Sequence, residues 1–162
     1  MNYYELFKLP ITPVIDKSGI SKKYFELQKE FHPDFYTNET EADKEKALEQ
    51  SAAINKGFNI FSNKEKTLEY FLQLKGIITT DEKYNLPPDF LMEMMELNEA
   101  IDDKNTQAQQ KINEFESELD TEISSILSTE KSSGFDDNAL LQLKAYYYKK
   151  KYLKRILDRL DD

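Results

Sequence analysis

The sequence predicts an all-α protein with a helical hairpin at the N-terminus and a three-helix bundle at the C-terminus. Apolar residues recur at spacings of three and four along most of the chain, and no stretch shows the sustained alternation of a half-buried strand. The 162 residues include only 4 glycines and 5 prolines, whereas 33% of them are charged. Long amphipathic helices with solvated faces account for this combination.

Four helices are expected in the first half of the chain. The first runs from Tyr3 to Leu9 and stops at Pro10, because proline interrupts a helix. The second follows the capping residue Asp16 and ends near Phe31. The third covers about residues 41–61, and the fourth opens at Ser62 and runs through Leu68, Phe71, Leu72 and Leu74. Their expected caps are Thr40, the capping-box sequence Ser62-Asn63-Lys64-Glu65 and, after the fourth helix, Gly76.

The connection between the second and third helices contains His32-Pro33-Asp34. Pro33 cannot continue the helix, and it moves His32 out of the helical region. His32 and Asp34 should therefore lie exposed and rigid at the tip of the hairpin. A lone histidine is often only a polar loop residue, so a functional role for the tripeptide has to be inferred from the sequence on both sides of it. The helix before it has the apolar face Ile20, Tyr24, Leu27 and Phe31, and the helix after it has the helical stripe Leu48, Ala52, Asn55, Phe58 and Phe61.

A linker, residues 76–88, should separate the hairpin from a bundle of residues 89–162. Pro88 suits the first position of the first bundle helix, which runs to about Ile101. The next helix spans about Asn105 to Ser128, with Ile112, Phe115, Leu119, Ile123 and Ile126 on one side. Asp136 or Asp137 should cap the last helix, whose inward residues are Leu140, Leu143, Tyr147, Leu157 and Leu160.

Composition and charge exclude several classes of protein. The chain has no cysteine, which excludes disulfides and thiolate metal sites and is compatible with a cytoplasmic location. The N-terminus lacks the basic and apolar regions of a signal peptide, and no apolar run reaches membrane-spanning length. The net charge of −9 divides into −1 for residues 1–75, −12 for 76–142 and +4 for 143–162. Overall acidity disfavours nucleic-acid binding, while the uneven distribution indicates attraction between helices of the bundle.

The stretch Leu91-Met92-Glu93-Met94-Met95-Glu96-Leu97 has more apolar residues than one face of a helix can hold. Some of them should pack inward while others stay exposed. Methionine adapts to different partners, so an exposed apolar patch flanked by carboxylates predicts a protein-binding surface. The alternative is that all of these apolar residues belong to the core.

Two further patterns have plainer interpretations. The run Tyr146-Tyr147-Tyr148-Lys149-Lys150-Lys151 has the composition of a nucleic-acid surface, but we expect packed tyrosines and lysines that face the acidic helix before them. Carboxylates alternate at a spacing of two from Glu114 to Glu122, which spreads them around a helix and forms no catalytic pair or metal cage. The sequence contains no nucleophile–base pattern, phosphate-binding glycine loop or His-carboxylate metal motif, so we expect no enzyme and no cofactor.

Several blocks of sequence, in the same order and over nearly the whole chain, resemble the HscB family of J-type co-chaperones. Residues 1–75 look like a J-domain because of Tyr3-Tyr4-Glu5-Leu6-Phe7, Tyr24-Phe25-Glu26-Leu27-Gln28 and His32-Pro33-Asp34. The more specific blocks are Gln50-Ser51-Ala52-Ala53-Ile54-Asn55, Tyr70-Phe71-Leu72-Gln73-Leu74-Lys75-Gly76 and Phe90-Leu91-Met92-Glu93-Met94-Met95-Glu96-Leu97.

The resemblance implies a co-chaperone for iron–sulfur cluster assembly, which stimulates a DnaK-type (HscA-like) ATPase and delivers an IscU-type scaffold protein to it. It implies that His32, Pro33 and Asp34 act on the chaperone. Lys22, Lys23 and Lys29 either steer the preceding helix onto an acidic chaperone surface or form an ordinary solvated face. The implied scaffold-binding residues are Leu91, Met92, Met95, Glu96, Glu99 and Tyr147. No zinc, nucleic acid or membrane is implied; the oligomeric state stays open, with a monomer expected.

The chain departs from the family pattern at Phe35, where lysine or arginine is usual, and at Asn98, where arginine is often found. Thr67-Leu68 likewise replaces a usual Arg-Ala pair. Two alternative functions stay open. One is a J-domain co-chaperone that serves a different client protein. The other is an enzyme with His32 as general base, for which the sequence offers no convergent partner residue.

Overall fold

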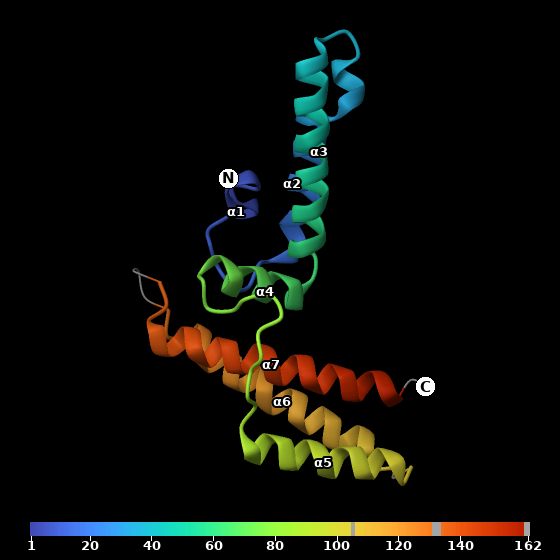
Figure 1. Ribbon diagram of the computed structural model, residues 1–162, viewed down its shortest axis with the longest axis vertical. Helices are drawn as coiled ribbons and strands as arrows, with labels where there is room; N and C mark the ends of the chain where they lie inside the picture. Colours follow the sequence, from blue (N-terminus) through green and yellow to red (C-terminus); the bar gives the residue numbers. More distant parts are fainter. Residues whose placement is uncertain (105, 131–133, 161–162) are drawn as a thin grey trace. The chain divides into compact units, whose positions relative to one another are not determined.

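The computed structural model describes residues 1–104, 106–130 and 134–160, and within these ranges it contains helices and no strand (Figure 1). The prediction of an all-α fold is confirmed. The chain divides into two compact units, Met1–Leu74 and Lys75–Asp162. No helix in the described ranges has the length and hydropathy needed to cross a membrane.

The first unit is built around a helical hairpin. Its helices are α1 (Tyr3–Leu6), α2 (Ile20–Phe31), α3 (Glu41–Phe61) and α4 (Lys64–Leu74), with 3-10 turns η1 (Lys17–Gly19) and η2 (Pro33–Tyr36) on either side of α2. Helices α2 and α3 lie side by side along the hairpin (Figure 1). Tyr4 of α1 and Phe7, which follows its last residue, pack against Phe61 of α3, with ring centroids 5.0 and 5.4 Å away, and all three rings are buried. This aromatic core holds the base of the hairpin.

Gly57 lets α1 approach α3 closely. A β-carbon at position 57 would lie 2.6 Å from Cε1 of Phe7, which is closer than real contacts allow. Phe7 is itself buried against Phe61, so its ring has little room to retreat. The packing distance therefore explains a glycine inside a long helix, where its conformational freedom is otherwise a cost.

The first helix is shorter than predicted. Helix α1 ends at Leu6 rather than Leu9, because Lys8 takes a left-handed φ of 54°. The N–H of Leu9 then donates to the carbonyl of Tyr4 at 2.8 Å, which closes the helix. Glycine is the usual residue in this closing pattern, so a lysine there gives no signal in the sequence.

Two predicted helix caps differ from the structure: one caps the preceding 3-10 turn, and the other is the next residue along the chain. Asp16 accepts a hydrogen bond from the N–H of Ser18 and so caps the turn η1 rather than α2. Asn63, not Ser62, caps α4 by accepting from the N–H of Lys66 at 2.9 Å. The caps Thr40 for α3 and Asp136 for α7 are confirmed.

The buried face of α3 is also displaced from the predicted stripe. Leu48, Ala52 and Asn55 are exposed, and the residues that face the core are Ala47, Ser51, Ile54, Gly57 and Phe61. Small residues line this face because neighbouring elements pack close to it. At its margin Tyr24 Oη donates to Asn55 Oδ1 at 2.8 Å, so Asn55 joins α3 to α2 by a hydrogen bond instead of by burial.

The second unit is a bundle of α5 (Pro88–Asp102), α6 (Ala108–Leu127) and α7 (Asp137–Leu160). Its fully buried side chains include Met94, Leu97, Ile112, Leu143 and Leu153. The expected helix start at Asn105 and the expected inward position of Leu160 lie outside the residues and side chains that the structure describes. Tyr146 Oη and Lys150 Nζ both donate to Asp120 Oδ1, at 3.2 and 3.3 Å. The expectation that lysines of the last helix face the acidic helix before it is thus confirmed for Lys150.

The stretch 76–87 has no regular structure and packs on α7, and the last residue of the predicted linker 76–88, Pro88, is the first residue of α5. Glu82 accepts hydrogen bonds from Lys144 Nζ at 2.8 Å and from Tyr148 Oη at 2.7 Å. The ring of Tyr84 stacks on that of Tyr148, with centroids 4.4 Å apart and planes 8° from parallel. The hydrogen bond from Lys144 holds the pKa of the Glu82 carboxyl below its usual range. These contacts fix the chain that leads into α5.

Candidate functional site

The tip of the hairpin is a short turn held by hydrogen bonds. Helix α2 ends at Phe31, and His32 takes the extended conformation (φ −64°, ψ 132°) that a following proline favours. The N–H of Asp34 donates to Nδ1 of His32 at 3.3 Å, and the N–H of Phe35 donates to the His32 carbonyl at 3.0 Å. Tyr36 Oη donates to the carbonyl of Glu30 at 2.9 Å, which ties the turn back to α2.

This geometry fixes the chemistry that the tip presents. Nδ1 of His32 accepts the hydrogen bond from the backbone of Asp34 and also lies 3.5 Å from Oδ2 of the Asp34 side chain. The side chain of Asp34 is 86% exposed and that of His32 is 46% exposed. The tip therefore offers a carboxylate and an imidazole edge on a proline-fixed backbone, as predicted. Among the described residues, Asp34 is the partner of the His32 side chain, and no other basic or nucleophilic side chain bonds to it.

The three lysines of α2 are not equivalent. Lys22 and Lys29 are exposed, whereas Lys23 is half-buried and its Nζ donates to the carbonyl of Lys8 at 3.4 Å. Lys23 therefore serves the fold of the first unit at least in part. A steering role for Lys22 and Lys29 stays a prediction.

Helix α5 divides its apolar residues between the core and the surface. Met94 and Leu97 are completely buried, whereas Met92 and Met95 are 62% and 63% exposed. This confirms the geometric expectation and excludes the alternative that every apolar residue of the stretch belongs to the core. Leu91 is half-buried, and Glu96 and Glu99 are exposed. Together they form one surface, the α5 face, which consists of Leu91, Met92, Met95, Glu96 and Glu99.

Tyr147, which we grouped with these residues, is buried in the bundle. Its ring meets that of Tyr148 edge-on, with centroids 5.0 Å apart, and Nζ of Lys151 lies 5.8 Å from its centroid. Burial favours a supporting role for this tyrosine over direct contact with a partner. The assignment of all six residues to scaffold binding stays a prediction.

Sequence reasoning missed Arg159, which borders the α5 face. Its guanidinium donates to Oδ1 of Asn98 and to Oδ1 of Asp102, both on α5. Asn98 and Asp102 are four residues apart, so they lie one turn from each other on the same side of the helix. That spacing of two acceptors, together with an arginine near the end of the last helix, is the signal that could have revealed the contact.

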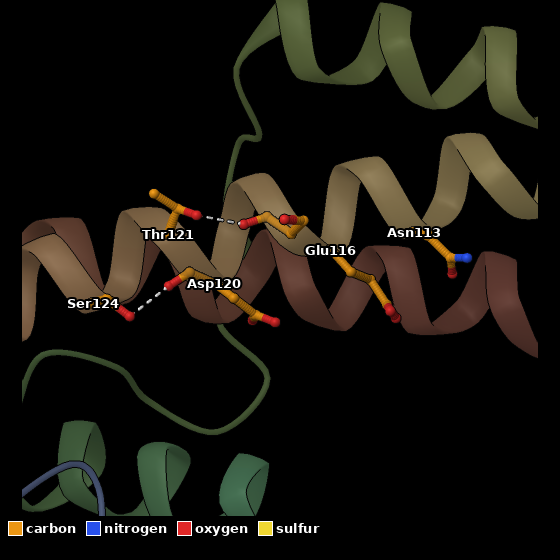
Figure 2. A pocket seen from close by; sticks show the side chains of 6 residues that line it. Asn113, Glu116, Asp120, Thr121 and Ser124 are labelled. Atoms are coloured by element: carbon orange, nitrogen blue, oxygen red, sulfur yellow. Dashed lines mark hydrogen bonds between the residues drawn. The ribbon is translucent and has the colours of Figure 1, made fainter.

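A shallow hollow runs along α6 and is lined by Asn113, Glu116, Ser117, Asp120, Thr121 and Ser124 (Figure 2). The hydroxyls of Thr121 and Ser124 donate to the backbone carbonyls of Ser117 and Asp120, as the dashed lines in Figure 2 show. Those hydroxyls are therefore engaged by the helix itself and do not point to nucleophilic chemistry. Within the described residues, no group of three or more His, Cys, Asp or Glu side chains is placed to hold a metal ion.

The chain is similar to known proteins over its whole length. A family model described as the HSCB C-terminal oligomerisation domain matches residues 86–161. The chain is 32% identical to a co-chaperone protein HscB homolog of Shewanella oneidensis, in an alignment that covers 99% of this chain and 95% of that protein. A homolog of the same name from Vibrio cholerae serotype O1 is 42% identical over 63% of this chain and 60% of its own length.

Two solved structures resemble this one. Chaperone HscB from Vibrio cholerae aligns with a TM-score of 0.60 and 29% identity and covers 99% of both chains. Human co-chaperone protein HscB aligns with a TM-score of 0.73 over 99% of this chain and 81% of the human chain. At 23% identity, the human protein shows a likeness of fold alone.

Proposed function

The chain belongs to the HscB family of co-chaperones, and from that premise we propose that it serves iron–sulfur cluster assembly in the cytoplasm. The first unit stimulates ATP hydrolysis by a DnaK-type, HscA-like chaperone, and the second unit delivers an IscU-type scaffold protein to it. The observation that carries the proposal is the tip of the hairpin, where a proline-fixed turn presents the exposed carboxylate of Asp34. The chain itself has no catalytic activity in this proposal.

The chemistry of stimulation takes place on the chaperone, so no proton transfer by His32 is required. The co-chaperone accelerates hydrolysis only if it binds the hydrolysis-competent state of the chaperone better than the other state. A turn whose backbone is already fixed by Pro33 and by bonds to His32 and Glu30 loses little conformational entropy when it docks. Rigidity at the tip therefore supports a role as a selective ligand for one chaperone state.

The α5 face has the properties expected of a protein-binding surface. Met92 and Met95 are exposed side by side, one turn apart on a helix whose opposite side is anchored by Met94 and Leu97. Methionine side chains repack easily around an apolar partner, and Glu96 beside them favours a partner with basic groups. The surface supports binding of a scaffold protein through an apolar centre with a basic rim.

The test is the steady-state ATPase rate of a DnaK-type chaperone, measured with and without this protein and with and without an IscU-type scaffold. Synergistic stimulation by the two proteins together supports the proposal. Stimulation that the scaffold does not increase would indicate a J-domain co-chaperone for another client. No stimulation under any condition, or turnover of a substrate by this chain alone, would contradict the proposed function.

A further inference from the structure

Arg159 is a cation of the last helix that is held against α5. It lies in the last turn of α7, where a cation ordinarily stabilises the carbonyl groups that end its own helix. Its guanidinium instead donates sideways, to Oδ1 of Asn98 and to Oδ1 of Asp102. Both acceptors belong to α5, so the arginine is tied to the helix that carries the α5 face.

The two acceptors continue a line of residues that belongs to the α5 face. Successive spacings of four, three and four residues place on one side of the helix Leu91, Met95, Asn98 and Asp102. The exposed side chain of Met95 therefore lies about one turn before the two acceptors. The guanidinium, which both acceptors hold, extends the α5 face beyond its methionines.

Arg159 stays accessible although it bonds to α5. Its side chain is 46% exposed, and that of Asp102 is 63% exposed. A guanidinium carries five N–H donors in a planar fork, so bonds to two acceptors leave donors for a further one. Because the two bonds already fix the fork, the side chain loses little conformational freedom when a partner binds to it.

Charges of opposite sign lie at the two edges of the α5 face. Residues two apart on an α-helix point in nearly opposite directions, so Glu96 and Asn98 mark opposite edges. Glu96 is an exposed carboxylate, whereas the edge at Asn98 carries the guanidinium of Arg159. The exposed side chains of Met92 and Met95 lie between them. The face is therefore an apolar centre with a negative edge and a positive edge.

We propose that Arg159 determines how the scaffold protein is oriented on the α5 face, by pairing with a carboxylate that borders the apolar surface of the scaffold. The arginine is continuous with the face that the proposed function assigns to the scaffold, which identifies its partner. A reversed scaffold would bring like charges together at both edges, so the two charges select one orientation. This inference rests on the proposed function and adds to it a specificity-determining residue and the charge that this residue recognises.

The experiment measures the dissociation constant for an IscU-type scaffold protein by isothermal titration calorimetry at low salt. Arg159→Glu should raise this constant by about tenfold, because an attractive contact becomes repulsive. Lys56→Glu makes the same change of net charge at an exposed site on α3 of the first unit, and should leave the constant unchanged. The effect of Arg159→Glu should shrink at about 500 mM salt, where exposed charges are screened.

Asp102→Asn separates contact with the scaffold from support of α5. This variant removes the charge that partly neutralises Arg159, so binding of the scaffold should tighten by about threefold. An arginine that only supported the helix would lose an anchor in this variant, and binding would weaken instead. The melting temperature by circular dichroism serves as the control for the fold of each variant.

Two results would overturn the inference: an unchanged dissociation constant in Arg159→Glu, or a failure of Asp102→Asn to tighten binding. If either occurs while Met92→Ala with Met95→Ala weakens binding, only the role of Arg159 fails and the proposed function stands. If the unmodified protein does not bind the scaffold at all, the proposed function fails together with the inference.

Discussion

The tip of the hairpin and the α5 face present side chains in opposite ways. At the tip the backbone is fixed by Pro33 and by hydrogen bonds to His32, and the exposed groups are short. On the α5 face the helix is fixed, while the exposed groups are the long side chains of Met92 and Met95. Short groups on a fixed turn distinguish two states of one partner, whereas adaptable side chains fit an apolar surface of varied shape. In the proposed function, one small chain thus holds a selective contact and a tolerant contact on separate units.

The largest expected effect tests the selective contact. Asp34→Asn keeps the size of the side chain and removes its charge, so stimulation of the chaperone ATPase should be lost while the fold is retained. The measurement is the maximal ATPase rate, with the circular dichroism melting curve as control. Asp43→Asn, an exposed carboxylate at the start of α3, is the matched variant and should stimulate normally. Full stimulation by Asp34→Asn would contradict the role of the tip as a contact that distinguishes two states of the chaperone.

The next effect tests the tolerant contact. Met92→Ala with Met95→Ala should weaken binding of an IscU-type scaffold by about tenfold, since two exposed apolar anchors are lost. Isothermal titration calorimetry measures the affinity, and the melting temperature should change little. Met94→Ala is the contrasting variant, because truncation of this buried residue should lower the free energy of unfolding by about 2–5 kcal/mol. Strong destabilisation by the double variant, with binding intact, would place the exposed methionines among the structural residues.

A smaller effect concerns the support of the α5 face. Arg159→Ala removes the contacts with Asn98 and Asp102 and should lower the free energy of unfolding by about 0.2–1 kcal/mol, a range typical of partly exposed pairs. Chemical denaturation measures the change. Arg155→Ala, an exposed arginine on the same helix, should cost less. Arg159→Lys should restore only part of the loss, because a lysine cannot bond both acceptors with a planar fork.

The smallest effect is a pH dependence in the segment that precedes α5. The folded-state pKa of Glu82 is lowered by its hydrogen bond with Lys144, so its stabilising contribution is complete above the usual value of 4.5 and is lost as the pH falls through the lowered value. Glu82→Gln should therefore lower the melting temperature at neutral pH. Calorimetry at neutral pH and near pH 3 should show that the gap between variant and unmodified protein narrows in acid. A constant gap would show that the carboxylate charge does not stabilise the segment.

The sequence predicted well those features that depend on local periodicity and backbone chemistry. Pro33 and Pro88 mark helix boundaries because a proline constrains its own backbone and that of the residue before it, whatever the rest of the fold. The division of Met92, Met94, Met95 and Leu97 between surface and core follows from helical geometry alone. Such features need no knowledge of what a helix packs against.

Features that depend on contacts between distant residues could not be predicted in this way. The buried face of α3 contains small residues such as Ala47 and Ser51. Where a small side chain is needed depends on how closely the neighbouring elements pack, and the sequence of α3 alone does not contain that information. The end of α1 depends on a left-handed Lys8, and the contact of Arg159 with α5 joins residues about sixty positions apart. Exposure of Phe25 and Phe35 was equally hidden, since an apolar residue read from sequence is more readily assigned to a core.

The close approach at Gly57 offers a route to a temperature-sensitive form of the protein. A methyl group at that position would press on the ring of Phe7 and loosen α1 from the aromatic core, without altering any residue of the two proposed binding surfaces. Gly57→Ala should thus leave both partner contacts intact at low temperature and lose the contact at the tip of the hairpin on mild heating, as the first unit unfolds. Such an allele would let the dependence of a living cell on this protein be switched off by a change of growth temperature.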